Sequence, residues 1–379
     1  MEYNKIVILG AGKIGRSFIG QVFGRAAYEV VFIDINRELI DLLNREKAYN
    51  VVVKSENGNQ TIRIENVRGL HLSDSQAVID ELASTSLAAL SVGQQGLLAA
   101  IPLIAKALIQ RNHSSNGYPL DVIIAENMRN ADSYIADKLA ELLPNGFNLN
   151  ENVGLIETSI GKMVPIMSKT DLDDDQLQVF AEPYNSLILA KNGFKNPIPQ
   201  IEFLSPKENI KAWVDRKLFI HNLGHAAAAY LGYQKIPSAT YLYEVLADQQ
   251  IYETTRQTML QSANILMALY PGEFTIEQLT SHIDDLLSRF QNKALGDTIF
   301  RVGCDLYRKL SPNDRLAGPI YSALKLHLPC NLLLDVVKAA VQFNATDEDG
   351  NRLPVDVLFA SETAIGFDYV LKNICKITN

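Results

Sequence analysis

The sequence predicts a two-domain α/β protein, with a doubly wound parallel sheet in the first half and mainly helices in the second. Three observations support this fold class. The chain has 379 residues, which is too long for one typical hydrophobic core. Hydrophobic residues make up 47% of it, enough to form the cores of two domains. The chain opens with a short apolar run and a glycine-rich turn, followed by apolar residues at helical spacing. The later part of the sequence consists mainly of long amphipathic stretches.

The first element is a strand followed by a glycine turn. Residues Lys5–Leu9 form a β-branched run that is typical of a buried parallel strand. Gly10, Gly12 and Gly15 follow as G-x-G-x-x-G, with Lys13 and Ile14 between them. The first glycine permits the tight turn, the second lets a pyrophosphate approach the backbone, and the third lets the helix pack closely.

The second strand ends in an acidic residue. Val30–Ile33 is an apolar run that leads directly into Asp34. A carboxylate at this place accepts hydrogen bonds from the adenosine ribose and repels a 2′-phosphate, which favours NAD over NADP. Arg37 leaves NADP open as a second cofactor. The order of strand, glycines, helix, strand and acid predicts a Rossmann-type NAD-binding domain, because a glycine motif without that context would be weak support.

A hairpin and two further buried strands are expected next. The stretch at residues 51–67 alternates in polarity around Asn57-Gly58, a turn-forming pair. The run at residues 87–93 reads as a strand that ends at Val92-Gly93, followed by a helix through residues 99–109. These residues would lie at the carboxyl edge of the sheet, where ligands bind in this architecture.

Asn127 ends the next expected strand, at residues 121–127, together with Glu126. Its place at the sheet edge predicts contact with nicotinamide or substrate. Equally, Asn127 would cap a helix that starts near Asn130. The pattern alone leaves both interpretations open.

The domain boundary is expected between residues 198 and 199. The strand-rich part ends near residue 190, and Asn192-Gly193 and Asn196–Pro199 are strong breakers. Residues 1–198 would form the NAD-binding Rossmann domain, and residues 199–379 a mainly helical substrate and catalytic domain. Long amphipathic stretches support the second assignment, at Thr240–Leu269, Thr275–Phe290 and Asn331–Phe343.

Composition limits the class of partner. The net charge of −8 argues against a broad nucleic-acid surface, which needs a basic stripe. We expect neither a signal peptide nor a membrane span, since no run of 18 apolar residues is present. Cys304, Cys330 and Cys375 lack a C-x-x-C spacing and read as reduced thiols of a cytoplasmic protein. A small-molecule substrate and a monomer or small homo-oligomer are expected.

The stretch KLFIHNLGHAAAAYLG places four polar groups in an apolar helix. At about 100° per residue, Lys217, His221, His225 and Asn222 share one arc of about 140°. A lysine in a poorly hydrated site can act as a base towards an alcohol, and an asparagine amide can stabilise the developing alkoxide. No metal is expected, because the two histidines lack the glutamate of an HExxH site. A purely structural role remained an equal alternative on the pattern alone.

These residues carry a resemblance. Lys217, Asn222 and His225 match the K-x4-N-x2-H motif of the polyol-specific long-chain dehydrogenases and reductases, which include the mannitol dehydrogenases. The similarity extends over nearly the whole chain, through GAGKIGRSFIG, AENM, RKLFIHNLGHAAAAYLG and RVGCDLYRKLSPNDRL. Length and these stretches most resemble the members that act on mannitol 1-phosphate.

The resemblance implies a Rossmann domain and a helical domain with the substrate cleft between them. It implies NAD-linked, metal-independent interconversion of mannitol 1-phosphate and fructose 6-phosphate. It assigns Lys217 as general acid/base, Asn222 and Asn127 as hydrogen-bonding partners of the reacting oxygen, and His225 as a group that positions substrate.

One departure concerns the substrate. Similar enzymes carry Asp-Arg before an apolar-Val-Pro segment, where this chain has Gly161 and Lys162. Lys162 could meet a phosphate as a point charge, and Arg308 and Lys309 are further candidates. Arg308 and Lys309 could equally be solvent-exposed charges or form ion pairs with Asp305 or Asp314, and this interpretation is at least as well supported as phosphate binding. An unphosphorylated polyol or a uronate is therefore the alternative substrate. An NAD(H) sensor without catalysis is the alternative of another class, and the intact set of Lys217, Asn222 and His225 argues against it.

Overall fold

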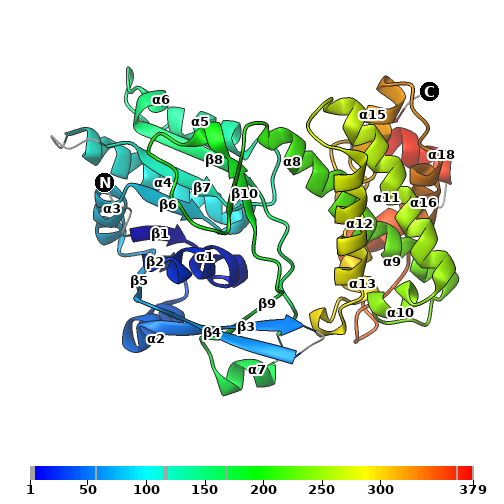
Figure 1. The fold of residues 1–379 in the computed structure, drawn as a ribbon, viewed down its shortest axis with the longest axis horizontal. Helices are drawn as coiled ribbons and strands as arrows, with labels where there is room; N and C mark the ends of the chain where they lie inside the picture. The colour runs from blue at the N-terminus through cyan, green and yellow to red at the C-terminus, as the bar shows by residue number, and fades with distance from the viewer. Residues whose placement is uncertain (1–4, 56–57, 114–117, 168, 364–365, 378–379) are drawn as a thin grey trace. The chain divides into compact units, whose positions relative to one another are not determined.

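The computed structural model describes residues 5–55, 58–113, 118–167, 169–363 and 366–377 (Figure 1). The chain divides into two compact units, Met1–Trp213 and Val214–Asn379. The first is an α/β unit and the second is mainly helical, which confirms the predicted fold class. The unit boundary falls within α8 (Ile210–Arg216), whereas the sequence suggested a division at 198/199. That earlier division would separate two strands that pair with each other, β10 and β11.

The main sheet of the first unit has eight strands in the order β11-β10-β8-β7-β6-β1-β2-β5. All its described pairings are parallel except that between β8 and β10. The order from β5 to β8 is that of a dinucleotide-binding Rossmann sheet. The strands are β1 (Lys5–Leu9), β2 (Glu29–Asp34), β5 (Val67–His71), β6 (Leu87–Leu90), β7 (Leu120–Ile124), β8 (Val153–Ser159), β10 (Leu187–Ala190) and β11 (Leu204–Lys207).

A smaller sheet of three strands lies beside it in the first unit. Its strands are β4 (Gly58–Glu65), β3 (Ala48–Ser55) and β9 (Val179–Ala181). The β3–β4 pairing is the predicted hairpin, in antiparallel register from Ala48↔Glu65 to Ser55↔Gly58. Of the predicted turn pair, Asn57 lies outside the described residues. β9 joins from far along the chain, parallel to β3.

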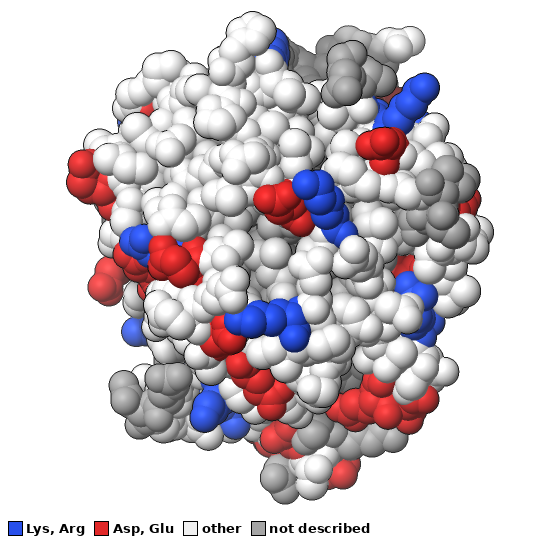
Figure 2. Space-filling model, turned by 90° about the vertical axis from the view of Figure 1, so that its right-hand side faces the viewer, with Lys and Arg blue, Asp and Glu red and all other residues white. Residues whose placement is uncertain are grey.

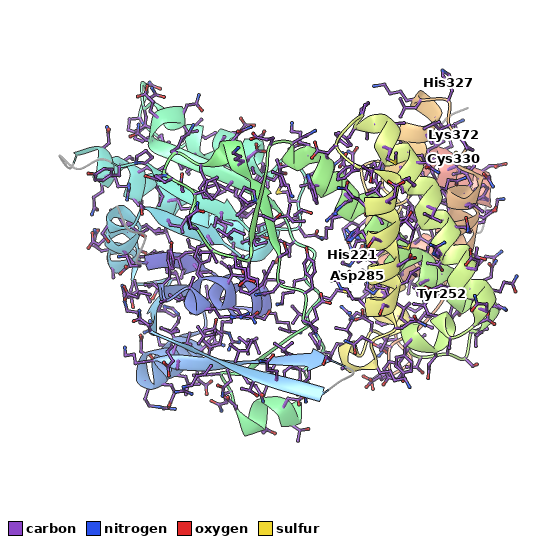
Figure 3. The ribbon with its side chains drawn as sticks, viewed as in Figure 1. His221, Tyr252, Asp285, His327, Cys330 and Lys372 are labelled. Atoms are coloured by element: carbon purple, nitrogen blue, oxygen red, sulfur yellow. The ribbon has the colours of Figure 1, made fainter. Side chains whose placement is uncertain are left out.

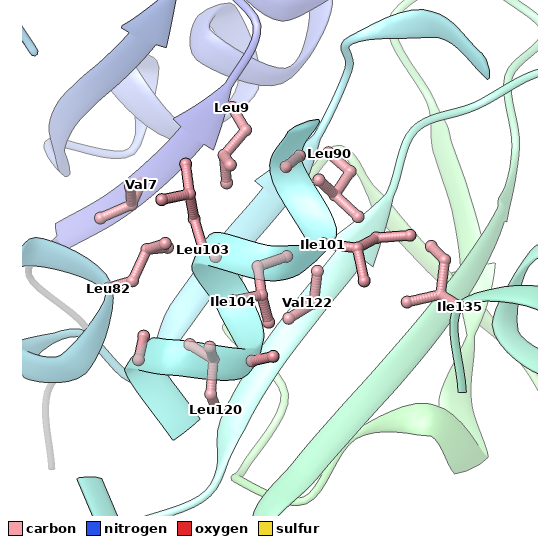
Figure 4. Packing of buried hydrophobic residues seen from close by; sticks show 14 of the residues in the cluster. Val7, Leu9, Leu82, Leu90, Ile101, Leu103, Ile104, Leu120, Val122 and Ile135 are labelled. Carbon is pink, nitrogen blue, oxygen red and sulfur yellow. The ribbon is translucent and has the colours of Figure 1, made fainter. Parts of the chain in front are cut away.

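Helices cover both faces of the main sheet. The helices of this unit include η1 (Gly15–Gly20), α1 (Gln21–Arg25), α2 (Arg37–Glu46), α3 (Ser75–Ser84), α4 (Gly93–His113), α5 (Ala131–Ala140), α6 (Leu149–Asn152) and α7 (Lys169–Asp174). Figure 4 shows the core on one face, where Leu103 and Ile104 of α4 pack among side chains of the strands. Val7 and Leu9 of β1 belong to this core, and alternation turns Ile6 and Ile8 to the opposite face. Burial on both faces explains the continuous apolar runs.

The second unit is a helical assembly around α9 (Leu223–Lys235). This helix packs against α10 (Leu242–Leu246), α11 (Gln249–Leu269), α13 (Ile299–Gly303) and α16 (Asn331–Val341). Ala226 to Ala229 are fully buried, and such small side chains let neighbouring helices approach closely. The remaining helices include η3 (Lys217–Asn222), α12 (Ile276–Phe290), η4 (Lys293–Leu295), α14 (Leu306–Lys309), α15 (Ala317–Lys325), α17 (Pro354–Thr363), α18 (Phe367–Tyr369) and η5 (Val370–Ile374).

One helical stretch differs from the sequence expectation. Thr240–Leu269 forms two helices, α10 and α11, rather than one. Asp248 separates them because its carboxylate accepts the N–H groups of Gln250 and Ile251, as an N-cap residue does. The stretches predicted to begin near Thr275 and Asn331 form α12 and α16.

The surface shows mixed charge. On the face in Figure 2, Lys and Arg side chains lie scattered, most of them beside Asp or Glu. Among the helices of the described residues, none is long and apolar enough to cross a membrane.

Candidate active site

The glycine turn of the first unit has the geometry that a dinucleotide site needs. Gly10 has φ +102°, and a Cβ there would lie 2.2 Å from the Ser91 carbonyl oxygen. A Cβ on Gly15 would lie 2.0 Å from the Gly10 oxygen, so both positions require glycine. A Cβ on Gly12 would meet no atom within 4 Å. Gly12 therefore borders open space, into which a pyrophosphate can approach the backbone.

Asp34 ends β2 against this turn. Its Oδ2 accepts a hydrogen bond from the Ala11 N–H at 2.7 Å, and its Oδ1 accepts one from Asn36 N–H at 2.9 Å. Arg37 lies nearby, but its guanidinium is 3.1 Å from His71 Nδ1 and 3.9 Å from an Asp74 oxygen. The carboxylate is thus fixed beside the glycines, while the arginine contacts the end of β5.

Lys13 and Ile14 lie between the second and third glycines. Lys13 is exposed and Ile14 is half-buried. The next turns form a π-helix, η1, which buries Phe18 and Ile19. Of the two residues, the exposed lysine has the freedom to reach a bound phosphate.

Val92 and Gly93 lie at the predicted sheet edge. Both backbone N–H groups donate to Glu126 Oε1, at 2.7 and 2.9 Å. Burial raises the pKa of Glu126, and the two N–H groups oppose that rise. Sequence reasoning placed Glu126 at this edge without recognising that its carboxylate holds the loop. The sequence did contain a signal for this role, because Glu126 is an acidic residue close behind a buried strand.

Asn127 follows Glu126 and is exposed. The helix after it, α5, has Asn130 at its N-cap with φ +52°. The first helical N–H, that of Ala131, donates to Glu157 Oε1 at 3.1 Å. Burial raises the pKa of Glu157, with Asp132 adding repulsion. The start of α5 therefore uses an acid from β8.

The predicted polar helix of the second unit begins as a π-helix. Lys217 to Asn222 form η3, and α9 continues from Leu223. The Leu223 N–H bonds the Leu218 carbonyl, an i→i+5 contact. The 100° spacing assumed from the sequence is therefore wrong over this segment. Such wide turns occur often at functional sites.

Lys217 lies half-buried at the start of η3. Burial, together with the charges of Arg315 and Arg308 and against the opposing effect of Asp314, lowers its pKa to about 7. A free lysine amine titrates near 10.4, so this environment leaves much of the amine neutral at physiological pH. A neutral amine can accept a proton from an alcohol. Asn222, at the other end of η3, is buried.

His225 lies one turn into α9 and has a defined partner. Its Nε2 is 2.8 Å from Asp297 Oδ2, and its ring stacks on Phe290 with centroids 4.7 Å apart. Burial lowers the pKa of His225, helped by Arg301, Arg315 and Lys309 in turn. Burial thus favours the neutral imidazole. Sequence reasoning missed Asp297, because nothing local links it to His225.

His221 is buried, and its ring lies near those of Phe290 and His225. The ring of His221, which is labelled in Figure 3, lies 5.6 Å from that of Phe290 and 6.3 Å from that of His225. Burial lowers its pKa, with Arg289 adding repulsion. Among the described residues, no group of three His, Cys, Asp or Glu side chains is arranged to hold a metal ion.

The three candidate phosphate ligands differ in their surroundings. Arg308 is half-exposed and pairs with Asp305 and, at 3.6 Å, with Asp314. Lys309 is buried, and its Nζ donates to the carbonyls of Val302 and Cys304. Burial lowers the pKa of Lys309 to about 8. Arg308 is thus the more exposed of the two and pairs with acids, while Lys309 donates to backbone carbonyls.

Lys162 belongs to the first unit. It is buried, and its Nζ donates to Asn185 Oδ1 at 2.7 Å and to Gln21 Oε1 at 3.1 Å. Its ammonium also lies 5.3 Å from the Phe18 ring centroid. Lys162 therefore joins η1 and α1 to the loop after β8.

Comparison with solved structures extends this picture. The chain is similar to a Pseudomonas fluorescens mannitol 2-dehydrogenase solved with NAD and D-mannitol, with a TM-score of 0.75 and 19% identity over 98% of this chain and 86% of that one. It is also similar to a substrate-free D-sorbitol dehydrogenase, with a TM-score of 0.74 and 16% identity over 92% of this chain and 82% of that one. At these identities the likeness shows the fold.

Family models cover nearly the whole chain. The mannitol dehydrogenase Rossmann domain matches residues 4–203, and the mannitol dehydrogenase C-terminal domain matches residues 209–365. The two family models follow the order of the two units, and their division at residues 203–209 lies close to the unit boundary at residues 213–214. The chain therefore belongs to the mannitol dehydrogenase family, as the K-x4-N-x2-H motif indicated.

Proposed function

We propose that this NAD-dependent polyol dehydrogenase interconverts mannitol 1-phosphate and fructose 6-phosphate, with Lys217 as general acid/base. The observation that carries the proposal is the burial of Lys217, which brings its pKa to about 7. An acid/base group works best when its pKa lies near the working pH, because both protonation states are then accessible.

In the oxidation, the neutral amine of Lys217 takes the proton of the substrate hydroxyl. The amide of Asn222 donates a hydrogen bond to the same oxygen and stabilises its developing charge, and the family motif assigns Asn127 the same role. In the reduction, the ammonium of Lys217 returns a proton to that oxygen. NAD, when bound, supplies the hydride acceptor. His225 positions a substrate hydroxyl.

The first unit suits that cofactor. Gly12 borders open space at the glycine turn, and the Asp34 carboxylate lies where it can accept from ribose hydroxyls. Lys13 and Ile14 flank the pyrophosphate position. Since the N–H groups of Val92 and Gly93 are engaged by Glu126, we assign these two residues contacts through their side chain and carbonyl atoms.

For the phosphate we assign Arg308 the main role. It is half-exposed, and its charge is felt at Lys217. A planar guanidinium can form two hydrogen bonds to phosphate oxygens. The N–H groups of Lys309 and Lys162 already have hydrogen-bond partners. We therefore assign these two lysines a role through their positive charge, without direct hydrogen bonds to the phosphate.

An unphosphorylated polyol or a uronate is the second candidate. Two acids, Asp305 and Asp314, already neutralise Arg308, which weakens the case for a dianionic ligand. The similar solved structures are named for mannitol and sorbitol, which carry no phosphate.

A reduction assay with NADH separates the candidates. We expect kcat/KM for fructose 6-phosphate to exceed that for fructose or a keto-uronate by at least about a hundredfold, the value of one or two charge-assisted hydrogen bonds. Arg308→Gln should remove most of that preference, with a much smaller effect on fructose reduction, which changes only through the lost positive charge near Lys217. Equal activity on fructose and its phosphate would refute the phosphate assignment and leave the dehydrogenase assignment intact.

A further inference from the structure

Asp297 is a buried acid that the proposed mechanism does not use. Its side chain is 4% exposed, and the residue precedes Thr298, the N-cap of α13. One oxygen, Oδ2, is 2.8 Å from His225 Nε2, and the other, Oδ1, pairs with Arg301. Each carboxylate oxygen therefore has its own partner.

The first contact fixes where the His225 proton lies. An ionised carboxylate can only accept hydrogen bonds, so Nε2 must carry the proton in the neutral imidazole. Nδ1 is then left with a lone pair. In this state the ring can accept a hydrogen bond through Nδ1.

The surrounding structure holds both partners in place. Phe290 stacks on the imidazole at an interplanar angle of 19°, which restricts the plane of the ring. The Asp297 carbonyl accepts the Leu242 N–H at 2.9 Å, and the adjacent Thr298 bridges Tyr241. The acid therefore sits on fixed backbone at the ends of α10 and α13.

We propose that Asp297 is a positioning residue that holds His225 in the Nε2–H form, so that Nδ1 accepts a hydrogen bond from a substrate hydroxyl. The inference deepens the proposed function and rests on it, since His225 is there assigned to the polyol. Carboxylates that orient a histidine in this way are common behind catalytic and metal-binding imidazoles.

Arg301 makes a sharp test available. In the Asp297→Asn variant, Arg301 can only donate, so it should retain the amide oxygen. The amide NH2 group then faces Nε2 and donates to it, which moves the imidazole proton to Nδ1. A second variant, Asp297→Asn combined with Arg301→Gln, frees the amide to turn its oxygen to Nε2 and should restore the original form.

The position of the imidazole proton can be measured by nitrogen-15 NMR of the full chain labelled at histidine. The measurement is made at about pH 8, where neutral imidazole dominates. Protonated and unprotonated ring nitrogens resonate far apart, and His225→Gln assigns the signals. We expect an unprotonated Nδ1 in the unmodified protein, a protonated one in Asp297→Asn, and an unprotonated one in Arg301→Gln and in the double variant. An unprotonated Nδ1 in Asp297→Asn would overturn the proposal.

Kinetics test the link to substrate. Asp297→Asn should lower kcat/KM for the polyol at least about tenfold, while the KM for NADH stays within twofold, and the double variant should recover part of the loss. A merely structural role predicts that the double variant is worse than the single one. A changed proton position with unchanged kcat/KM would refute the substrate contact. If the unmodified protein turned over no polyol or polyol phosphate, the proposed function would fail, while the NMR result on Asp297 would still stand.

Discussion

Lys217 owes its reactivity to its place in the second unit. The amine is half-buried, and Arg315 and Arg308 add positive charge around it. Both effects disfavour the ammonium form, and Asp314 offsets them only in part. The sequence motif located this lysine, but its pKa also depends on Arg308, Asp314 and Arg315, which lie far along the chain from it.

The pH dependence follows from the direction of that shift. Because the pKa lies near 7, polyol oxidation should rise about tenfold per pH unit below 7 and level off above it, as the ammonium loses its proton. Carbonyl reduction should show the opposite trend and persist at lower pH. Steady-state rates between about pH 5 and 10 measure this profile.

Two substitutions at Lys217 complete that test. Lys217→Arg keeps a positive charge but removes the titrating base, since arginine stays protonated. It should lower turnover by roughly 10²–10⁴-fold, as Lys217→Ala should, with NAD binding nearly unchanged. Turnover that survives either substitution would show that another group is the base.

Residues that act through others were harder to foresee. Asp297 is separated from His225 by 72 positions, and Glu126 from Val92 by 34. Neither pair leaves a periodic signal in the sequence, because only the tertiary fold brings its members together. By contrast, Gly10, Gly12, Gly15 and Asp34 follow from local geometry that the chain must satisfy to make its turn.

At the scale of elements, each unit contains a π-helix at its group of predicted site residues. η1 follows the glycine turn, and η3 carries Lys217, His221 and Asn222. Sequence patterns predicted helices at both places but not their wider turns. A period of 3.6 residues and a short π-segment differ by too little over six residues to be separated by apolar spacing alone.

The glycine turn offers a substitution that separates binding from folding. Gly12→Val places a side chain in open space at an ordinary backbone conformation, so the free energy of unfolding should change by no more than about 0.5 kcal/mol. The same side chain would occupy the pyrophosphate position, and NAD affinity should fall at least tenfold. Denaturant unfolding and NADH fluorescence titration measure the two effects.

Gly15→Val is the matched control. Its side chain would overlap the Gly10 carbonyl, so this variant should lose stability as well as NAD binding. Unaltered NAD affinity in Gly12→Val would place the pyrophosphate elsewhere.

For the whole molecule, the two-unit organisation was largely predictable. The Rossmann order of strands follows from local runs and glycines, and the helical unit from long amphipathic stretches. The pairing of β9 with β3 of the predicted hairpin and the pairing of β10 with β11 were not foreseen, because these partners are chosen by tertiary contacts. The sequence also suggested a division before β11, although that strand pairs with β10 of the first unit.

Cofactor binding should be visible in the stability of the whole chain. A ligand that binds only the folded protein stabilises it by about 2.7 kcal/mol at one hundred times its Kd. NAD at that excess should raise the thermal unfolding midpoint by several degrees, measured by scanning calorimetry. Lys217→Ala should show the same rise and Gly12→Val little or none. A rise in Gly12→Val equal to that of the unmodified chain would point to binding outside the glycine turn.

The parallel pairing of β9 with β3 also bears on how the chain is made. Val51 pairs with Val179, so the small sheet cannot be completed until the ribosome has released residues far beyond the hairpin. At typical synthesis rates the hairpin emerges roughly 6 to 25 s before β9 does. During that interval the edge of β3 that later pairs with β9 is unpaired. A nascent chain in this state would be a substrate for chaperones that bind exposed strand edges.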